Sequence, residues 1–183
     1  MIARSAACWT LLALVACAPT RGQGDAAAAE EARPTTTVVL VRHAEKAAEP
    51  AQDPPLTEAG AARARALLDA LADARVNAIY STNYARTRDT AQPLSDAAGV
   101  PVTVISDTRN FIPQVAERIR ADHAGDVVVV VGHSNTIGST IEALGGTNVG
   151  DLPDEAYDRF FVVLLQDGAP TRVIQSRFGA PTP

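Results

Sequence analysis

Two runs of β-branched residues, each followed by a histidine, constrain the fold of this chain more than any other feature. His43 follows the run from Thr37 to Arg42, and His133 follows the run from Val127 to Gly132. Short unbroken runs of this kind are typical of buried parallel strands. Because ligands of open α/β sheets bind beyond the carboxyl ends of such strands, we expect both imidazoles to share one site.

The N-terminal segment 1–17 has the pattern of an export signal. Arg4 supplies a positive charge, and the apolar stretch 6–16 is shorter than the roughly 20 residues that a membrane-spanning helix needs. The stretch ends in Leu14-Val15-Ala16-Cys17, which resembles a bacterial lipoprotein signal box. This resemblance implies cleavage before Cys17 and lipidation of Cys17, so that the exported protein touches the membrane only through this anchor, in the cell envelope or periplasm. The alternative is an ordinary secretory peptide cut after Ala18.

Composition divides the rest of the chain into a linker and one domain. Residues 18–34 contain no large apolar side chain, which predicts a flexible linker. Residues 35–183 are long enough for a single domain. Both cysteines, Cys8 and Cys17, precede this domain, so its chemistry uses no thiol nucleophile and no Cys-ligated zinc. The net charge of −5 and the scattered arginines predict no nucleic-acid partner.

The domain alternates β-branched runs with Ala-, Leu- and Arg-rich helical patterns, which is typical of a largely parallel α/β sheet. Strands are predicted near residues 37–41, 76–80, 102–105 and 127–131. Residues 160–165 and 171–176 flank a predicted hairpin loop, which gives the sheet an antiparallel margin.

Four helices are predicted between these strands. Thr57 caps the first, in which Arg63 falls off the buried face. The second covers about 84–98, with a kink or break at Pro93, and the third covers about 113–123. Asn135 is predicted to cap the fourth.

Side chains suited to phosphate chemistry follow three of the strands. Arg42 can make forked contacts with phosphate, and neutral His43 can act as a nucleophile toward phosphorus. Arg86 falls in the first turn of the second helix, where N–H groups and the helix dipole favour anions, whereas Arg88 faces elsewhere. These groups can neutralise the charge of a transferring phosphoryl group and attack it in line.

The order Arg42-His43, then Arg86, then Gly132-His133, each past a strand, resembles the histidine phosphatase superfamily, also called phosphoglycerate-mutase-like, over residues 35–183. The resemblance implies a three-layer α/β/α sandwich and hydrolysis of a phosphomonoester or phosphoramidate. Short loop insertions predict an open pocket, which admits a small substrate or a surface-presented phosphate. The resemblance also implies that His43 becomes phosphorylated while Arg42, Arg86 and His133 hold the phosphoryl oxygens. Arg42-His43-Ala44, in place of the common Arg-His-Gly, resembles the shorter phosphohistidine-phosphatase-like branch.

The acid that protonates the leaving group is open at this point. In many members of the family, a carboxylate between the second arginine and the second histidine serves. Asp107 follows the third strand and is the first candidate, and its alternative role is a turn or helix cap. Glu45 is the second candidate, and its alternative is an ion pair with Lys46 or Arg42.

No metal and no cofactor is expected, because no carboxylate cluster adjoins these residues and the arginines oppose a second cation. A zinc site of His43, His133 and a carboxylate is the rival interpretation. Two other functions stay open: a phosphoglycerate-mutase-type phosphotransferase, and an inactive module that only binds phosphate. The third histidine, His123, has the sequence context of a helix end.

Overall fold

The structure is a computed structural model that describes residues 33–183. The predicted signal peptide, the lipidation site Cys17 and most of the predicted linker lie outside the described residues. Within residues 33–183, no helix has the length and apolar character needed to cross a membrane.

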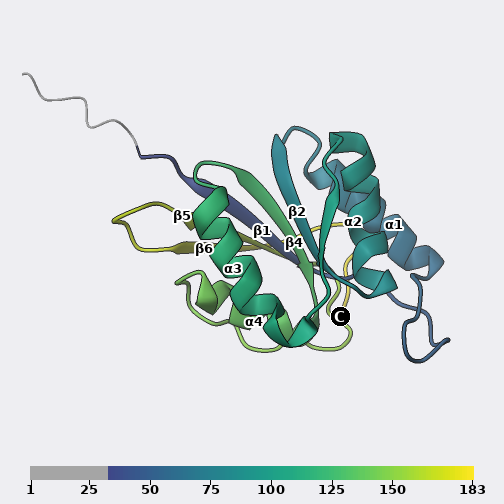
Figure 1. Ribbon diagram of the computed structural model, residues 1–183. Helices are drawn as coiled ribbons and strands as arrows, with labels where there is room; N and C mark the ends of the chain where they lie inside the picture. The colour runs from purple at the N-terminus through teal and green to yellow at the C-terminus, as the bar shows by residue number, and fades with distance from the viewer. Residues whose placement is uncertain (1–32) are drawn as a thin grey trace, which may run out of the picture. The chain divides into compact units, whose positions relative to one another are not determined.

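A single six-stranded sheet forms the centre of the domain, in the order β3-β2-β4-β1-β5-β6 (Figure 1). Strands β1 to β4 pair in parallel, β5 is antiparallel to β1, and β6 is antiparallel to β5. The antiparallel margin predicted from residues 160–176 is therefore confirmed. The strands are β1 (Thr36–Arg42), β2 (Val76–Thr82), β3 (Val102–Ile105), β4 (Val127–Gly132), β5 (Arg159–Leu165) and β6 (Arg172–Arg177).

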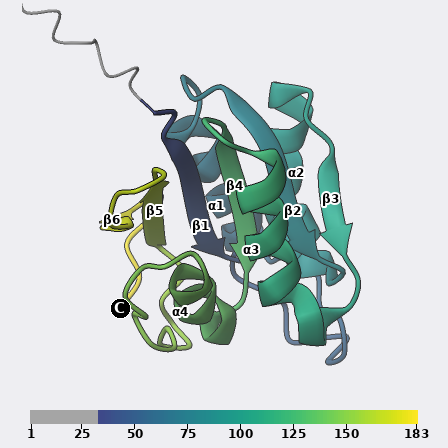
Figure 2. The same ribbon diagram turned by 60° about the vertical axis from the view of Figure 1, so that its left-hand side comes forward.

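Helices cover both faces of the sheet, as Figure 2 shows. Helices α1 (Glu58–Ala70) and α2 (Ala85–Ala98) pack on one face, and α3 (Phe111–Asp122) and α4 (Ser134–Ala143) pack on the other. Alternate residues of a strand point to opposite faces. Val39 and Val41 accordingly pack toward α1 and α2, while Val38 and Leu40 pack toward α3 and α4. The predicted α/β/α sandwich with a mostly parallel sheet is confirmed.

Three local predictions need correction. Arg63 is not on the solvent side of α1 but is only 4% exposed, because Glu45 lies close enough to neutralise it. Helix α2 continues through Pro93, so of the kink or break predicted there, the break does not occur. The N-cap of α4 is His133 rather than Asn135, and its backbone N–H donates to Thr136 Oγ1 at 2.8 Å.

Candidate active site

The carboxyl ends of three parallel strands meet at a cavity of about 430 Å³. Arg42 ends β1, and His133 follows β4 directly. Because β1 and β4 pair in parallel with Arg42 opposite Gly132, the two strands deliver these side chains to the same edge. The His43 N–H donates to the Gly132 carbonyl at 2.9 Å, which continues this pairing by one residue. Arg42, Arg86 and His133 line the cavity, and His43 packs against His133 with ring centroids 5.4 Å apart.

The surroundings of His43 determine which ring nitrogen is free. Its Nδ1 lies 2.8 Å from the Ala44 carbonyl oxygen, which can only accept, so Nδ1 carries the proton and Nε2 keeps its lone pair. Burial is the main cause that lowers the pKa of His43 to about 3, and the nearby charges of His133 and the arginines lower it further. The ring is therefore neutral at ordinary pH, which is the form that can attack phosphorus.

His133 is held by a chain of two hydroxyl groups. Its Nε2 lies 3.0 Å from Thr82 Oγ1, which lies 2.8 Å from Thr87 Oγ1. The Thr87 hydroxyl also lies 2.8 Å from the Tyr84 carbonyl oxygen and 3.2 Å from the Thr82 carbonyl oxygen. Either hydroxyl can donate in the contact between Thr82 and Thr87, so this chain orients the His133 ring while either ring nitrogen can carry the proton. Burial, followed by the charges of Arg86 and Arg42, lowers the pKa of His133 to about 4.

Arg42 is fixed by the loop that precedes β5. Its Nη1 donates to the carbonyls of Pro153 at 2.9 Å and Asp154 at 2.8 Å. Its guanidinium lies over the Tyr157 ring, 4.3 Å from the centroid. Only 4% of Arg42 is exposed, and burial lowers its pKa. The loop thus holds a buried cation at the base of the cavity.

Arg86 has a similar arrangement on the opposite side. Its guanidinium lies 4.1 Å from the centroid of the Tyr84 ring, and its Nη1 is 3.8 Å from Asp53 Oδ1. The same Asp53 oxygen accepts from the Ala85 N–H at 2.8 Å, so Asp53 also caps the first turn of α2. The first turn therefore carries Arg86 toward the cavity, as its position in the sequence predicts.

Each guanidinium has one buried donor without an acceptor. Among the described residues, neither Arg42 Nε nor Arg86 Nε has a hydrogen-bond partner. A buried donor that stays unsatisfied costs about 1–3 kcal/mol. Both arginines line the cavity, so an anion between them would neutralise their charge, and phosphate has the oxygens to accept from both guanidiniums.

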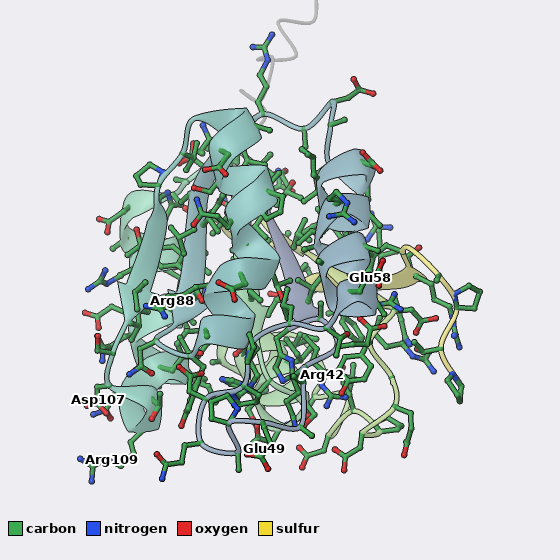
Figure 3. The ribbon with its side chains drawn as sticks, turned by 90° about the vertical axis from the view of Figure 1, so that its right-hand side faces the viewer. Arg42, Glu49, Glu58, Arg88, Asp107 and Arg109 are labelled. Atoms are coloured by element: carbon green, nitrogen blue, oxygen red, sulfur yellow. The ribbon has the colours of Figure 1, made fainter. Side chains whose placement is uncertain are left out.

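The structure places Asp107 in a capping role. Its Oδ1 accepts from the Arg109 N–H at 3.2 Å, and its Oδ2 accepts from Asn110 Nδ2 at 2.6 Å. The bond from Asn110 is the main cause that lowers the pKa of Asp107, opposite to what a proton donor requires. Figure 3 shows Asp107 and Arg109 at the outer margin of the molecule, away from Arg42. Thr108, the next residue, is the one that lines the cavity.

Glu45 makes an ion pair, although with a different partner from the two considered above. Both carboxylate oxygens lie 3.0 Å from Arg63 Nε, and Oε1 lies 2.7 Å from Arg63 Nη2. Gly60 allows this arrangement, because a Cβ at that position of α1 would collide with the Glu45 carbonyl. Among the described residues, Asp154 is the one carboxylate that lines the cavity. Its side chain is 91% exposed, and its Oδ1 lies 4.0 Å from Arg42 Nη2.

Several residues of the site carry no strong local signal in the sequence. Tyr157 and Asp154 belong to a loop between α4 and β5 that has no recognisable motif, and only the fold brings it beside Arg42. Thr82 is a strand residue whose hydroxyl becomes informative only beside His133. The segment Asp53-Pro54-Pro55 has the composition of a turn, but this composition does not indicate the contact of Asp53 with α2.

No group of three or more His, Cys, Asp or Glu side chains within residues 33–183 is arranged to hold a metal ion. His43 and His133 face each other without a third such ligand. The donors around the cavity are instead guanidinium, imidazole and hydroxyl groups, which suit an anion.

The buried imidazoles predict a loss of stability in mild acid. An unfolded chain protonates its histidines near pH 6.5, whereas folded His43 and His133 protonate only near 3 and 4. Both are neutral in both states above pH 6.5, so the free energy of unfolding falls as the pH drops from about 6.5 toward 4. Thermal unfolding of the wild type and of His133→Asn at pH 7 and pH 5 measures this pH dependence. Between these two pH values, the free energy of unfolding should fall less in the variant than in the wild type. Equal losses in the two proteins would contradict this pH dependence.

Comparison with known proteins agrees with this geometry. The sequence profile of the histidine phosphatase superfamily (branch 1) matches residues 38–111. No curated protein sequence matches significantly. A solved structure of a SixA protein from Agrobacterium tumefaciens, for which phosphohistidine phosphatase activity has been proposed, is 30% identical; the alignment covers 80% of this chain and 98% of that one, with a TM-score of 0.59.

Two further solved structures share the fold. The protein histidine phosphatase SixA in complex with tungstate is 18% identical, with a TM-score of 0.62 over 77% of this chain and 96% of that one. A phosphoglycerate mutase from Plasmodium falciparum is 19% identical, with a TM-score of 0.55 over 81% of this chain and 95% of that one. From the 30% identical relative, the family profile and the site geometry together, we conclude that the chain belongs to the histidine phosphatase superfamily.

Proposed function

We propose that this protein is a metal-independent phosphatase that forms a covalent phosphohistidine on His43. The observation that carries the proposal is the pairing of a neutral His43, whose Nε2 lone pair is free, with two buried guanidinium donors that lack an acceptor among the described residues. Attack by Nε2 forms the N–P bond as the bond to the leaving group breaks. Water then attacks phosphorus, which releases phosphate and returns the lone pair to Nε2.

We further propose that the substrate is a phosphoramidate, such as a phosphohistidine, or a phosphoester with a good leaving group. An alkyl alkoxide leaves only with the help of an acid. Asp107 is engaged as a cap, Glu45 is engaged with Arg63, and Asp154 is almost fully exposed. A protonated imidazole or a phenolate leaves with less help, and one structural neighbour is a protein histidine phosphatase.

A comparison of leaving groups tests both parts of this proposal. We expect the protein to hydrolyse an aryl phosphate and phosphoramidate much faster than an alkyl phosphate, in the presence of EDTA and with inhibition by vanadate. Asp107→Asn should change none of these rates by more than about twofold, because Asp107 touches neither phosphate nor leaving group. A loss confined to the alkyl ester in Asp107→Asn would instead identify it as the acid. Loss of all activity in EDTA would support the zinc alternative, and vanadate binding without turnover would indicate an inactive phosphate-binding module.

Export and anchoring are also part of the proposal. The segment 1–17, with its apolar stretch and the Leu14-Val15-Ala16-Cys17 sequence, supports lipidation of Cys17 and a place in the cell envelope or periplasm. An enzyme held there would act on small phosphorylated molecules or on phosphate presented at a surface.

A further inference from the structure

A buried hydroxyl from α2 holds the residue that follows the nucleophile. Thr90 is fully buried, and its Oγ1 accepts a hydrogen bond from the Ala44 N–H at 2.9 Å. The same oxygen donates to the Arg86 carbonyl at 2.7 Å. A hydroxyl has one hydrogen, so the bond to Arg86 leaves a lone pair of Thr90 facing Ala44. One side chain thereby joins the nucleophile segment to the residue that carries the second guanidinium.

We propose that Thr90 is a positioning residue for phosphoryl transfer. Its bond to the Ala44 N–H fixes the orientation of Ala44, whose carbonyl keeps the proton of His43 on Nδ1. The N–H and the carbonyl of Ala44 lie on the two sides of one Cα, so loss of the bond to Thr90 releases the peptide between His43 and Ala44 and, with it, the position of the Cα that carries the carbonyl. This inference rests on the proposed function, because it assigns Thr90 the task of presenting the His43 Nε2 lone pair.

Other contacts hold Glu45, the next residue, whereas the Thr90 hydroxyl is the side-chain group that bonds to Ala44. The Glu45 carbonyl accepts from the Thr57 N–H at 2.9 Å, and the Glu45 carboxylate is paired with Arg63. These bonds secure the far end of the segment against α1. Ala44 itself is fully buried, and the Thr90 hydroxyl is the acceptor of its N–H. A buried N–H needs such an acceptor, and water has no access to replace it.

The purely local role of such a threonine can be separated from this bridging role. Threonines in helices often donate to the carbonyl four residues earlier. Thr140 in α4 does so, with a distance of 2.7 Å to the Thr136 carbonyl and 1% exposure. Apart from this carbonyl, no group within residues 33–183 bonds to the Thr140 hydroxyl. Thr140→Val is therefore a matched control for Thr90→Val.

The test compares turnover of an aryl phosphate by Thr90→Val, Thr90→Ser and Thr140→Val under conditions where circular dichroism shows folded protein. We expect Thr90→Val to lower kcat by roughly 10- to 100-fold with little change in KM, because a small displacement of a reacting group has such an effect. Thr90→Ser keeps the hydroxyl and should stay within a few-fold of the wild type, as should Thr140→Val. If Thr90→Val does not fold, Thr90→Cys applies the same test, because its thiol is of similar size and forms only weak hydrogen bonds.

A second measurement does not depend on turnover. The ¹⁵N spectrum of the His43 ring should show the Nδ1–H form in the wild type and in Thr140→Val, and a mixture of both forms in Thr90→Val. An unchanged spectrum together with kcat equal to that of Thr140→Val would overturn the role of Thr90. A wild type that shows the Nδ1–H form but hydrolyses no phosphate compound would overturn the proposed function instead.

Discussion

His43→Ala is expected to abolish phosphate release, with a loss of at least about 10⁴-fold in kcat, because no other group can take the place of the nucleophile. In the structure, His43 is a neutral imidazole whose Nδ1 bonds to the Ala44 carbonyl and whose Nε2 keeps its lone pair. His133 lacks this arrangement, because its Nε2 is occupied by the contact with the Thr82 hydroxyl at 3.0 Å. Brief incubation with a ³²P-labelled substrate should give an acid-labile, alkali-stable label on the wild type and none on His43→Ala.

The matched control is the third histidine of the domain. His123 bonds to the Tyr80 hydroxyl at 2.9 Å and to Asp126 Oδ2 at 2.9 Å, and it does not line the cavity. His123→Ala should therefore be labelled like the wild type for an equal amount of folded protein. A label that persists in His43→Ala would refute the covalent mechanism, whatever its rate of hydrolysis.

Arg86→Ala is expected to lower kcat by roughly 10²- to 10³-fold, corresponding to about 3–4 kcal/mol of transition-state stabilisation. The guanidinium is fixed against the Tyr84 ring before any substrate binds, and its buried Nε has no acceptor among the described residues. A preorganised charge of this kind contributes most when negative charge moves onto the transferring oxygens, so the loss should fall on kcat more than on KM. Steady-state kinetics with an aryl phosphate measures both quantities.

Arg88→Ala provides the comparison for this prediction. Arg88 lies two positions further along α2 and is exposed, so it has the same charge on the same helix without reaching the cavity (Figure 3). Its substitution should change kcat by less than about twofold. Equal effects of Arg86→Ala and Arg88→Ala would show that general positive charge, rather than a fixed contact, is what matters.

The four residues of the proposed phosphate site could be selected from the sequence because their positions depend on local features. Arg42 and His43 end one β-branched run, Gly132 and His133 end another, and Arg86 lies in the first turn of a helix. Parallel strands bring their carboxyl ends to one edge of the sheet, so the strand order alone makes these residues neighbours. The same local reasoning gave the antiparallel hairpin at the margin.

The role of Arg63 shows where local reasoning ends. Helical spacing puts this residue off the apolar face of α1, yet it is buried because Glu45, 18 residues away, accepts its hydrogen bonds. A hydrophobic pattern registers only apolar burial and cannot recognise a buried ion pair. The cap of α4 is a similar case, because the choice between His133 and Asn135 depends on the Thr136 hydroxyl that bonds to the His133 N–H.

The sequence by itself determined the parallel sheet with its antiparallel margin, the order of its main elements along the chain, and the choice of side chains that we propose for the phosphate site, because each of these follows from short-range patterns of hydrophobicity and chain direction. The tertiary structure alone decided which loop holds Arg42 and that Arg63 is the partner of Glu45. Both properties depend on hydrogen bonds between residues far apart in the chain, as does the bond between Ala44 and Thr90, and no local pattern specifies such pairs.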